Sequence, residues 1–385
     1  MLLGLRSAAT VGLKTGDAAI NPNARVVVMT TEILRNILYR SAGSGAGDGA
    51  LADVGLVVLD EVHYLSDMDR GTVWEECVIY CPKDVPLLCL SATVGNPDDL
   101  QGWISAVHGP CDLVTSAWRP VPLSFYYAKR GSDERGGWPG LGPLLSRRGD
   151  RLNRALDEQV DEERDGSSRG PRMLSSWRRD APSQESVVRH LVREDMLPAI
   201  WFIFSRARCD EAVACMASSS TLVTPEERAR LSAALEGLRV SCPEALRPEY
   251  AAPLLAGVAA HHAGCLPAWK SFVEELFQEG LLKVVFATET LAAGINMPAR
   301  AVVLASTSKR DAEGPRRLTV NEFMQMAGRA GRRGFDTQGS VVVVQSAFEG
   351  ATSASELALG EPEARGACLH ASMHARVSRH MYSSC

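Results

Sequence analysis

Residues 54–65 read VGLVVLDEVHYL, and this stretch decides the fold class. Residues 54–59 form a continuous apolar run, which is typical of a strand buried on both faces of a parallel sheet. Asp60 and Glu61 follow directly, and residues at the carboxyl end of a parallel strand face the crevice in which such sheets bind ligands. The stretch therefore predicts an α/β domain with an acidic pair at its ligand-binding edge.

The acidic pair indicates a particular chemistry. Two carboxylates can hold Mg²⁺, often through water, and can polarise a water molecule for attack on a γ-phosphate. An Asp-Glu dipeptide alone usually lies on a solvated surface. With an apolar strand directly in front of Asp60, Glu61 and His63, the functional interpretation stands beside the structural one.

Strand-like and helix-like segments alternate along the rest of the chain. Two strand-like runs, 25–29 and 86–93, flank the opening stretch, each with a helical segment beside it. The alternation resumes at residue 196 and ends in the apolar run 339–345. This order predicts right-handed βαβ units and therefore parallel sheets.

The composition divides the chain into four parts. We expect a first α/β domain over residues 1–129 and a second over 186–350. Residues 130–185 are rich in Gly, Arg, Asp, Ser and Pro, which predicts a linker or insertion of low order. Residues 351–385 have no apolar period, so we expect an irregular tail there.

The overall composition is that of a globular protein and excludes few functions. The chain has 385 residues, a formal net charge of −5 and 45% hydrophobic residues, so no global positive field indicates a nucleic-acid partner. A basic cleft alone would suffice for such a partner. The ten cysteines show no zinc-binding spacing, and we expect reduced, mostly buried thiols. No apolar run approaches the length of a membrane span.

Hydroxyl groups follow the strand after the acidic pair. Ser91 and Thr93 lie at its end, from which they can bridge the carboxylates to a neighbouring domain. In isolation a Ser-Ala-Thr sequence is usually a helix cap or a turn. The adjacent histidines His261 and His262 are most simply structural, because no other Cys or His stands at metal-ligand spacing from them.

A second polar segment follows the apolar run 284–286. It begins with Thr288 and Glu289 and continues through Gly294 and Asn296. Hydroxyls and free amides in such a loop can contact nucleic-acid phosphate on one side and nucleotide on the other.

Residues 325–334, QMAGRAGRRG, form the most specific string in the chain. Arg329 and Arg332 stand three apart, so on a continuous helix they would share a face. Two guanidinium groups side by side suit a triphosphate. A solvated basic helix is the weaker interpretation, because the glycines at 328, 331 and 334 weaken a helix and need another reason.

Taken in order, these motifs resemble the superkiller-like DExH-box RNA helicases of superfamily 2. The matching strings are TGD, TTEIL, LDEVHYL, SATV, AIWFIFSR, AAHHAG, VVFATETLAAGINMPA and QMAGRAGRRG. They cover about residues 11–130 and 186–350. Within the group, GVAAHHAG and CLPAWKSFVEELFQEG are most similar to the plastid branch of green plants and algae. The resemblance implies two tandem RecA-like domains, ATP and Mg²⁺ as cofactors, RNA as partner, and a plastid location.

The resemblance also implies roles at the nucleotide. Asp60 would coordinate Mg²⁺ through water, and Glu61, at the same metal, would be the general base for the hydrolytic water. His63 would couple the nucleotide site to Gln325. Arg329 and Arg332 would reach the phosphates, with Arg332 as the preferred arginine finger.

Further roles concern coupling and RNA. Ser91 and Thr93 would link hydrolysis to strand movement, and Gly294 and Asn296 would serve nucleotide binding and coupling. Single-stranded RNA would be bound through its backbone, without sequence specificity. The residues that would face it are Thr30, Thr31, Glu32, Phe204, Ser205, Thr288 and Glu289.

The chain departs from the family pattern at both ends. It contains no Gly-Lys dipeptide, and therefore no Walker A motif G-x-x-x-x-G-K-[ST]. The TGD motif, which the family places well downstream of Walker A, begins at residue 15. We therefore expect a first domain without its N-terminal strands, a chain incomplete at both ends, and impaired catalysis.

Two rival functions stay open. A non-catalytic RNA-binding module would keep the second domain and its surfaces without turnover, and a DNA helicase of the related repair group would share the same motifs. The charges of residues 130–185 either contact RNA or stay solvated, and the solvated interpretation is favoured.

Overall fold

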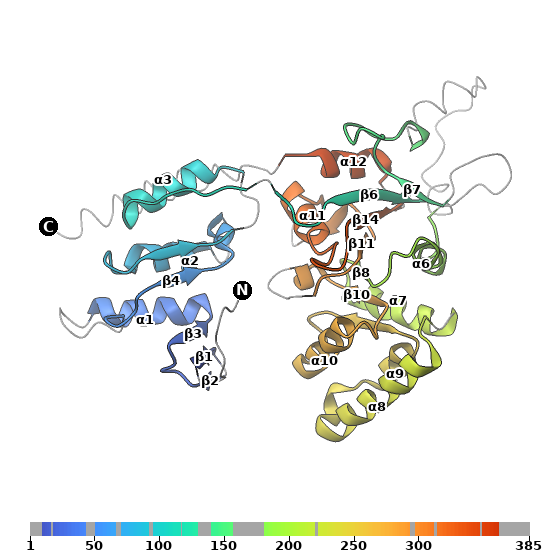
Figure 1. The fold of residues 1–385 in the computed structure, drawn as a ribbon, viewed down its shortest axis with the longest axis horizontal. Helices are drawn as coiled ribbons and strands as arrows, with labels where there is room; N and C mark the ends of the chain where they lie inside the picture. The colour runs from blue at the N-terminus through green and yellow to red at the C-terminus, as the bar shows by residue number, and fades with distance from the viewer. Residues whose placement is uncertain are drawn as a thin grey trace. The chain divides into compact units, whose positions relative to one another are not determined.

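The computed structural model describes two compact units, one up to Ser116 and one from Ala117 to Glu361 (Figure 1). Each unit has a hydrophobic core of its own. The residues described are 10–16, 18–43, 51–66, 71–91, 95–116, 118–129, 140–156, 181–219, 222–292, 297–311, 314–346 and 349–361. No helix within these ranges combines the length and the apolar character needed to cross a bilayer.

The first unit has short strands alternating with helices. Its β1, β2 and β3 form one sheet in the order β2-β1-β3, and β4 pairs in parallel with β5 in another. The elements are β1 (Val11–Lys14), β2 (Ala19–Ile20), β3 (Val26–Met29), α1 (Thr31–Gly43), β4 (Val57–Leu59), the 3₁₀ helix η2 (Val62–Ser66), α2 (Gly71–Tyr80), β5 (Leu87–Cys89) and α3 (Pro97–Val107).

Burial in this unit corrects one expectation. Val57 and Leu59 are buried, but Val58 between them is 49% exposed, so the strand is covered on one face only. Leu88 on the paired strand β5 is 45% exposed in the same way. The buried face packs on the core formed with α1, α2 and α3, and no described element covers the other. The continuous apolar run indicated the strand, but β4 is not buried on both faces.

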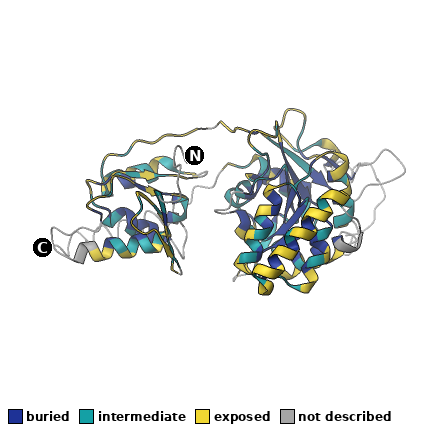
Figure 2. Cartoon of the chain, turned by 60° about the horizontal axis from the view of Figure 1, so that its bottom comes forward, coloured by how far each residue is buried: buried dark blue, intermediate teal, exposed yellow. Residues whose placement is uncertain are grey.

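The second unit is built on a seven-stranded sheet in the order β7-β6-β14-β11-β8-β10-β9. Every neighbouring pair is parallel except β6 and β7. The strands are β6 (Leu123–Ala128), β7 (Leu141–Pro143), β8 (Ala199–Phe202), β9 (Val258–His261), β10 (Val284–Ala287), β11 (Ala301–Leu304) and β14 (Gly339–Val344). The central strands β8, β10, β11 and β14 are buried throughout, as the dark layer in Figure 2 shows.

Helices cover this sheet and connect its strands. They are α6 (Gln184–Arg193), α7 (Arg206–Ser219), α8 (Pro225–Ser241), α9 (Pro248–Leu255), α10 (Pro267–Gln278), α11 (Val320–Ala327) and α12 (Ala351–Leu359), with the 3₁₀ helices η3 (Arg154–Leu156), η4 (Pro243–Ala245) and η5 (Glu289–Ala292), and a hairpin of β12 (Ser308–Arg310) and β13 (Pro315–Arg317). The start of α8 is set locally by a capping box between Thr224 and Glu227, and that of α11 by one between Thr319 and Glu322.

The boundaries expected from composition need three corrections. Residues 123–128 belong to the second unit, since β6 pairs along its whole length with β14, so the units divide near 117 and not after 129. Part of the expected low-order insertion is folded, because β7 pairs with β6 and Leu144 is fully buried. Residues 351–359 form α12, whose Ala351 and Ala354 are buried in the core. Residues 130–139, 157–180 and 362–385 lie outside the described residues.

Half of the described cysteines are buried. Those within the described ranges are all free, and Cys77, Cys81, Cys209 and Cys265 are buried, whereas Cys215 is exposed. In Cys77 and Cys209 burial raises the thiol pKa to about 12.

The first residue of α2 allows a test of the first unit. A Cβ on Gly71 would overlap the carbonyl oxygen of Leu65, so Gly71→Ala should lower the free energy of unfolding by about 2 kcal/mol. Gly102, inside α3, has open space around its Cβ position, and Gly102→Ala is the matched control. It should raise stability by about 0.5–1 kcal/mol. Urea titration measures both, and equal effects would contradict the close approach at Gly71.

Candidate functional site

The acidic pair lies where β4 ends and η2 begins. Asp60 is exposed, and its Oδ1 accepts a hydrogen bond of 2.9 Å from the N–H of Glu61. The backbone of Glu61 has φ 54°, a left-handed conformation that residues other than glycine rarely adopt and that often marks a functional turn. The Nδ1 of His63 lies 3.2 Å from the Glu61 carboxylate. Three predicted catalytic residues therefore form one compact turn.

Aromatic side chains pack against this turn. The ring of His63 stacks on Tyr64 with centroids 4.8 Å apart, and Tyr64 in turn packs on Trp74 of α2 at 5.5 Å. The Nε1–H of Trp74 donates a 3.3 Å hydrogen bond to the carbonyl of Asp60. Trp74 is 14 residues from Asp60 in sequence, and it links the acidic turn to the core helix α2.

The hydroxyl after β5 lies at the same edge as the acidic turn. Because β4 and β5 run parallel, with Leu59 opposite Cys89, their carboxyl ends coincide. The chain stays paired beyond the strands, since the N–H of Leu90 donates to Leu59 and that of Val62 donates to Leu90. Ser91 is the next residue and is exposed. Thr93 lies outside the described residues.

The predicted RNA-facing residues of the first unit follow β3. Thr30 is exposed, and its carbonyl accepts the first backbone hydrogen bonds of α1, from Ile33 and Leu34. Thr31 and Glu32 occupy the first turn of that helix. The N–H of Thr30 also donates to Lys14 at the end of β1, so the two motif segments lie side by side.

In the second unit, two of three adjacent strands bring predicted RNA-facing residues to one edge. Ala287 of β10 is in register with Phe202 of β8 and with His261 of β9. The loops that follow therefore leave together, and they carry Phe204, Ser205, Thr288 and Glu289. The hydroxyls of Thr288 and Thr290 lie 3.0 Å apart, and the Ser205 hydroxyl accepts from the N–H of Arg208 at the start of α7.

Glu289 is not a free carboxylate in this structure. Its Oε2 lies 2.5 Å from the Nζ of Lys309, which also contacts Glu322 at 3.0 Å. Arg316 forms two hydrogen bonds with Glu322. The network connects the η5 segment, the β12–β13 hairpin and α11, three elements that no sequence pattern had grouped.

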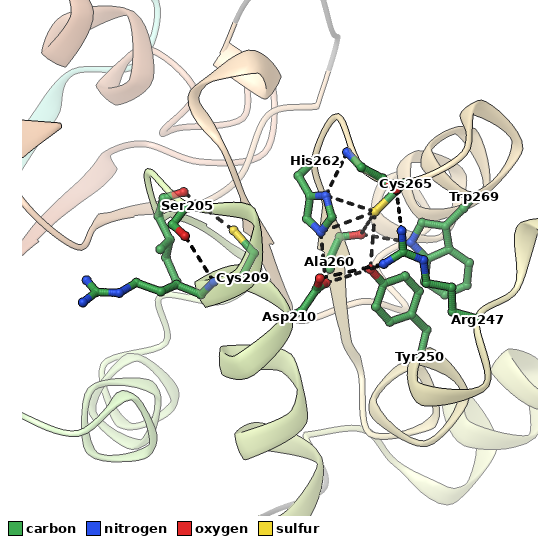
Figure 3. Close-up of polar contacts among 12 residues, drawn as sticks. Ser205, Cys209, Asp210, Arg247, Tyr250, Ala260, His262, Cys265 and Trp269 are labelled. Carbon is green, nitrogen blue, oxygen red and sulfur yellow. Dashed lines mark hydrogen bonds and ion pairs between the residues drawn. The ribbon is translucent and has the colours of Figure 1, made fainter. Parts of the chain in front are cut away.

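The adjacent histidines are structural within the described residues, as expected. His262 pairs with Asp210 of α7 at 2.9 Å (Figure 3). His261 pairs with Glu274 at 2.8 Å, and both rings are buried. The Cys265 thiol and Asp210 raise the pKa of His262 against the effect of burial. No group of three or more His, Cys, Asp or Glu side chains in the described ranges is placed to hold a metal ion.

The network around His262 holds the turn after β9. The N–H of Gly264 donates to His262 Nδ1 at 3.1 Å, and Arg247 donates to the carbonyl of Gly264 at 2.6 Å. Tyr250 contributes a 2.7 Å hydrogen bond to Asp210. Figure 3 shows these side chains converging beside Cys265 and Trp269.

The arginine-rich string differs from its expected geometry. Helix α11 ends at Ala327, and Gly331 has φ 89°, so Arg329 and Arg332 lie in a loop beyond the helix and share no helix face. The glycines terminate the helix, which is the physical reason for the difference. Gln325 lies within α11 and is partly buried.

Arg329 links this loop to the segment that carries Thr288. Its Nε donates a 3.0 Å hydrogen bond to the carbonyl of Ala292, the last residue of η5. Backbone hydrogen bonds of 2.9 and 2.8 Å join Ala299 to Arg329 and Gly331. Gly294 and Asn296 lie between these contacts in sequence but outside the described residues.

Arg332 is held by a residue that none of the sequence motifs includes. The backbone N–H, Nε and Nη2 of Arg332 all donate to Asp336, at 2.8 to 3.0 Å. Asp336 also accepts from Arg300 at 3.0 Å, and its side chain is only 2% exposed. Burial opposes ionisation, but the hydrogen bonds from Arg332 and Arg300 outweigh it and lower the pKa of Asp336 to about 2.

This arrangement orients the predicted arginine finger. With Nε and Nη2 bound to Asp336, Nη1 has no partner within the described residues and remains available to an anion. The only sequence signal for Asp336 was an acidic residue four positions after Arg332, which is common on protein surfaces. Its significance depends on burial and on Arg300, which sequence does not reveal.

The lowered pKa of Asp336 predicts an acid-dependent stability. A carboxyl group whose folded pKa lies below its unfolded value stabilises the fold above about pH 4 and loses that effect as pH falls toward 2. Asp336→Asn should therefore cost about 2 kcal/mol at pH 7 and progressively less toward pH 3. Glu185→Gln, which removes an exposed pair with Arg189, is the control and should cost less than about 0.5 kcal/mol. Urea titrations at several pH values measure this, and parallel curves for wild type and Asp336→Asn would refute it.

Comparison with known proteins identifies the two units. The DEAD/DEAH box helicase model matches residues 4–100, and the helicase conserved C-terminal domain matches residues 249–334. The chloroplastic DExH-box ATP-dependent RNA helicase DExH15 of Arabidopsis thaliana is 49% identical over 90% of this chain and 32% of its own length. The exosome RNA helicase MTR4 of Homo sapiens is 36% identical over 94% of this chain and 34% of its own length.

A third relative, the superkiller complex protein 2 of Homo sapiens, is 37% identical over 87% of this chain and 27% of its own length. The chain thus spans about a third of the length of these relatives. The two matched models and the order of the motifs agree with two tandem RecA-like domains. The chain belongs to the superkiller-like group of the superfamily 2 DExH-box RNA helicases.

Proposed function

We propose that this chain forms the core of an ATP-dependent RNA helicase, in which ATP hydrolysis drives movement along single-stranded RNA. The observation that carries the proposal is the hydrogen bond from Arg329 to Ala292. It connects the loop of residues 328–332, called the arginine loop below and predicted to sense phosphate, to the segment of Thr288, which is predicted to contact RNA. A motor needs such a connection, because a change at the nucleotide must alter the grip on the strand.

The acidic turn is suited to Mg²⁺ held through water. Mg²⁺ keeps several of its own waters and usually takes only one or two carboxylates from the protein. Asp60 is exposed, and among the described residues its side chain accepts only a backbone N–H, so its oxygens remain available to a hydrated ion. When bound, the metal neutralises charge on the phosphates. Glu61, held beside His63, would accept the proton of the attacking water.

This chain contains only some of the groups expected to bind the phosphates of ATP. Arg332, oriented by Asp336, offers its free Nη1, and Arg329 lies nearby in the same loop. The sequence contains no Walker A lysine or glycine-rich loop to hold the β- and γ-phosphates. One well-placed donor is worth roughly 3 kcal/mol in such sites, so the loss of several is severe.

We therefore expect little or no ATP turnover from this chain by itself. RNA-stimulated ATPase of the wild type should not exceed that of Glu61→Gln, which lacks the predicted general base and sets the background. Turnover above that background, rising with added RNA, would overturn the predicted inactivity while supporting the motor function.

RNA binding does not depend on the missing phosphate contacts and tests the proposed RNA edge. The double variant Ser205→Ala/Thr288→Ala should weaken single-stranded RNA binding about tenfold, because two backbone-directed hydroxyls are removed. Ser241→Ala removes an exposed hydroxyl from α8 and is the matched control. Fluorescence anisotropy with labelled RNA measures both, with a DNA strand of equal sequence as competitor. An unchanged affinity in the double variant would reject the proposed edge, and preferred DNA binding would favour the repair-helicase alternative.

A non-catalytic RNA-binding module is the second candidate. The observation in its favour is that the seven-stranded unit has its own core and carries its own set of predicted RNA-facing residues. A module of this kind would bind RNA with the usual salt dependence but without response to an ATP analogue. At analogue concentrations high enough to offset the absent phosphate contacts, a motor core should change its RNA affinity by about fivefold or more in the presence of Mg²⁺.

The location that we propose is the plastid. Support comes from the chloroplastic relative of Arabidopsis thaliana, which is 49% identical. Cell fractionation with an antibody against this chain would test it, and a signal confined to other compartments would reject it.

A further inference from the structure

The second unit begins with a segment, residues 119–122, that contacts the arginine loop. Arg119 lies just past the division between the units, and its Nη2 donates to the carbonyls of Gly328 and Ala330, at 3.1 and 3.2 Å. Its Nε donates to Val121 at 2.8 Å, which fixes the direction of the guanidinium. The two contacts span 209 and 211 residues of sequence, so chain proximity does not explain them.

Close packing supports the same junction. A Cβ on Gly331 would overlap the side chain of Val121, so the loop and the entering segment touch without room for even one methyl group. The N–H of Gly339, at the start of β14, donates a 2.8 Å hydrogen bond to Pro122. Residues 119–122 therefore contact the loop through the side chains of Arg119 and Val121, and the start of β14 through the backbone.

The carbonyls that Arg119 binds have a particular importance. Gly328 caps α11, and the last carbonyls of a helix lack intrahelical partners and attract cations. The two bound carbonyls also stand on either side of Arg329, in the residues just before Arg332. Fixing them fixes the backbone from which both phosphate-directed arginines project.

We propose that Arg119 is a positioning residue that fastens the loop of residues 328–332 to the segment by which the chain enters the second unit. Arg329 and Arg332 then move together with that segment. The consequence for ATP hydrolysis rests on the function proposed above. The positioning itself is a property of this chain and can be measured without turnover.

The measurement uses the side-chain Nε–H groups of arginine. In ¹⁵N-arginine-labelled chain, the Nε–H of Arg332 should give a slowly exchanging NMR signal, because it is bound to the nearly buried Asp336. Arg332→Lys assigns the signal by removing it. Hydrogen exchange followed by mass spectrometry reports on the amides of residues 328–332 in the same samples.

Three variants separate positioning from general stability. Arg119→Ala removes the fork, Arg119→Lys keeps the charge with a single point of contact, and Arg189→Ala removes an exposed arginine of α6 that pairs with Glu185. In Arg119→Ala we expect the Arg332 signal to shift or broaden and the loop amides to exchange about tenfold faster or more. Arg119→Lys should restore part of the effect, and Arg189→Ala should match the wild type.

Two outcomes would overturn the proposal. An Arg332 signal that is unmoved in Arg119→Ala would mean that Arg119 only fills space. Faster exchange throughout β8, β10 and β14 as well as in the loop would mean that the variant destabilises the whole unit. Neither outcome depends on ATPase activity, so the RNA-binding and turnover assays test the proposed function separately from this proposal.

Discussion

The parallel pairing of β8, β9 and β10 is the constraint on which the second unit depends. Backbone hydrogen bonds hold Phe202, Ala287 and His261 in one register, so the three following loops leave the sheet at a common edge. Because the strands are buried throughout, a slip of register would move apolar side chains out of the core. The sheet therefore holds together segments that are far apart in sequence, and the candidate RNA contacts follow from that arrangement.

The arginine loop is held from several directions, and each contact comes from a different part of the chain. Arg329 reaches Ala292, Arg332 is bound by Asp336, and Arg119 binds the backbone carbonyls on either side of Arg329. A loop with several glycines gains little stability from its own residues, because glycine loses much conformational freedom on folding. External hydrogen bonds supply the order instead. This makes the loop responsive, since a shift in any holding element alters where the guanidinium groups lie.

Much of the architecture could be predicted from residue patterns, and the errors have identifiable causes. The alternating segments located most strands and helices, and the acidic turn lies after β4 as its position implied. The continuous apolar run around β4 did not mean burial on both faces, because coverage depends on what packs against a strand and not on its composition. The spacing of Arg329 and Arg332 suggested a helix face, but the helix ends at Ala327. The charged insertion concealed β7, whose three residues are too few to show a period.

The sequence by itself determined the class of fold, the family, and the identity of the polar residues that follow each strand, because these depend on local pattern and ordered motifs. Only the tertiary structure revealed Asp336, Arg300 and Arg119 as the residues that hold the arginine loop. Their importance depends on burial and on partners up to 211 residues away. The sequence does not show whether an arginine or aspartate is solvated or buried. The free energy of the charged side chain differs between the two, because a buried charge loses its water and needs hydrogen bonds that only the folded chain supplies.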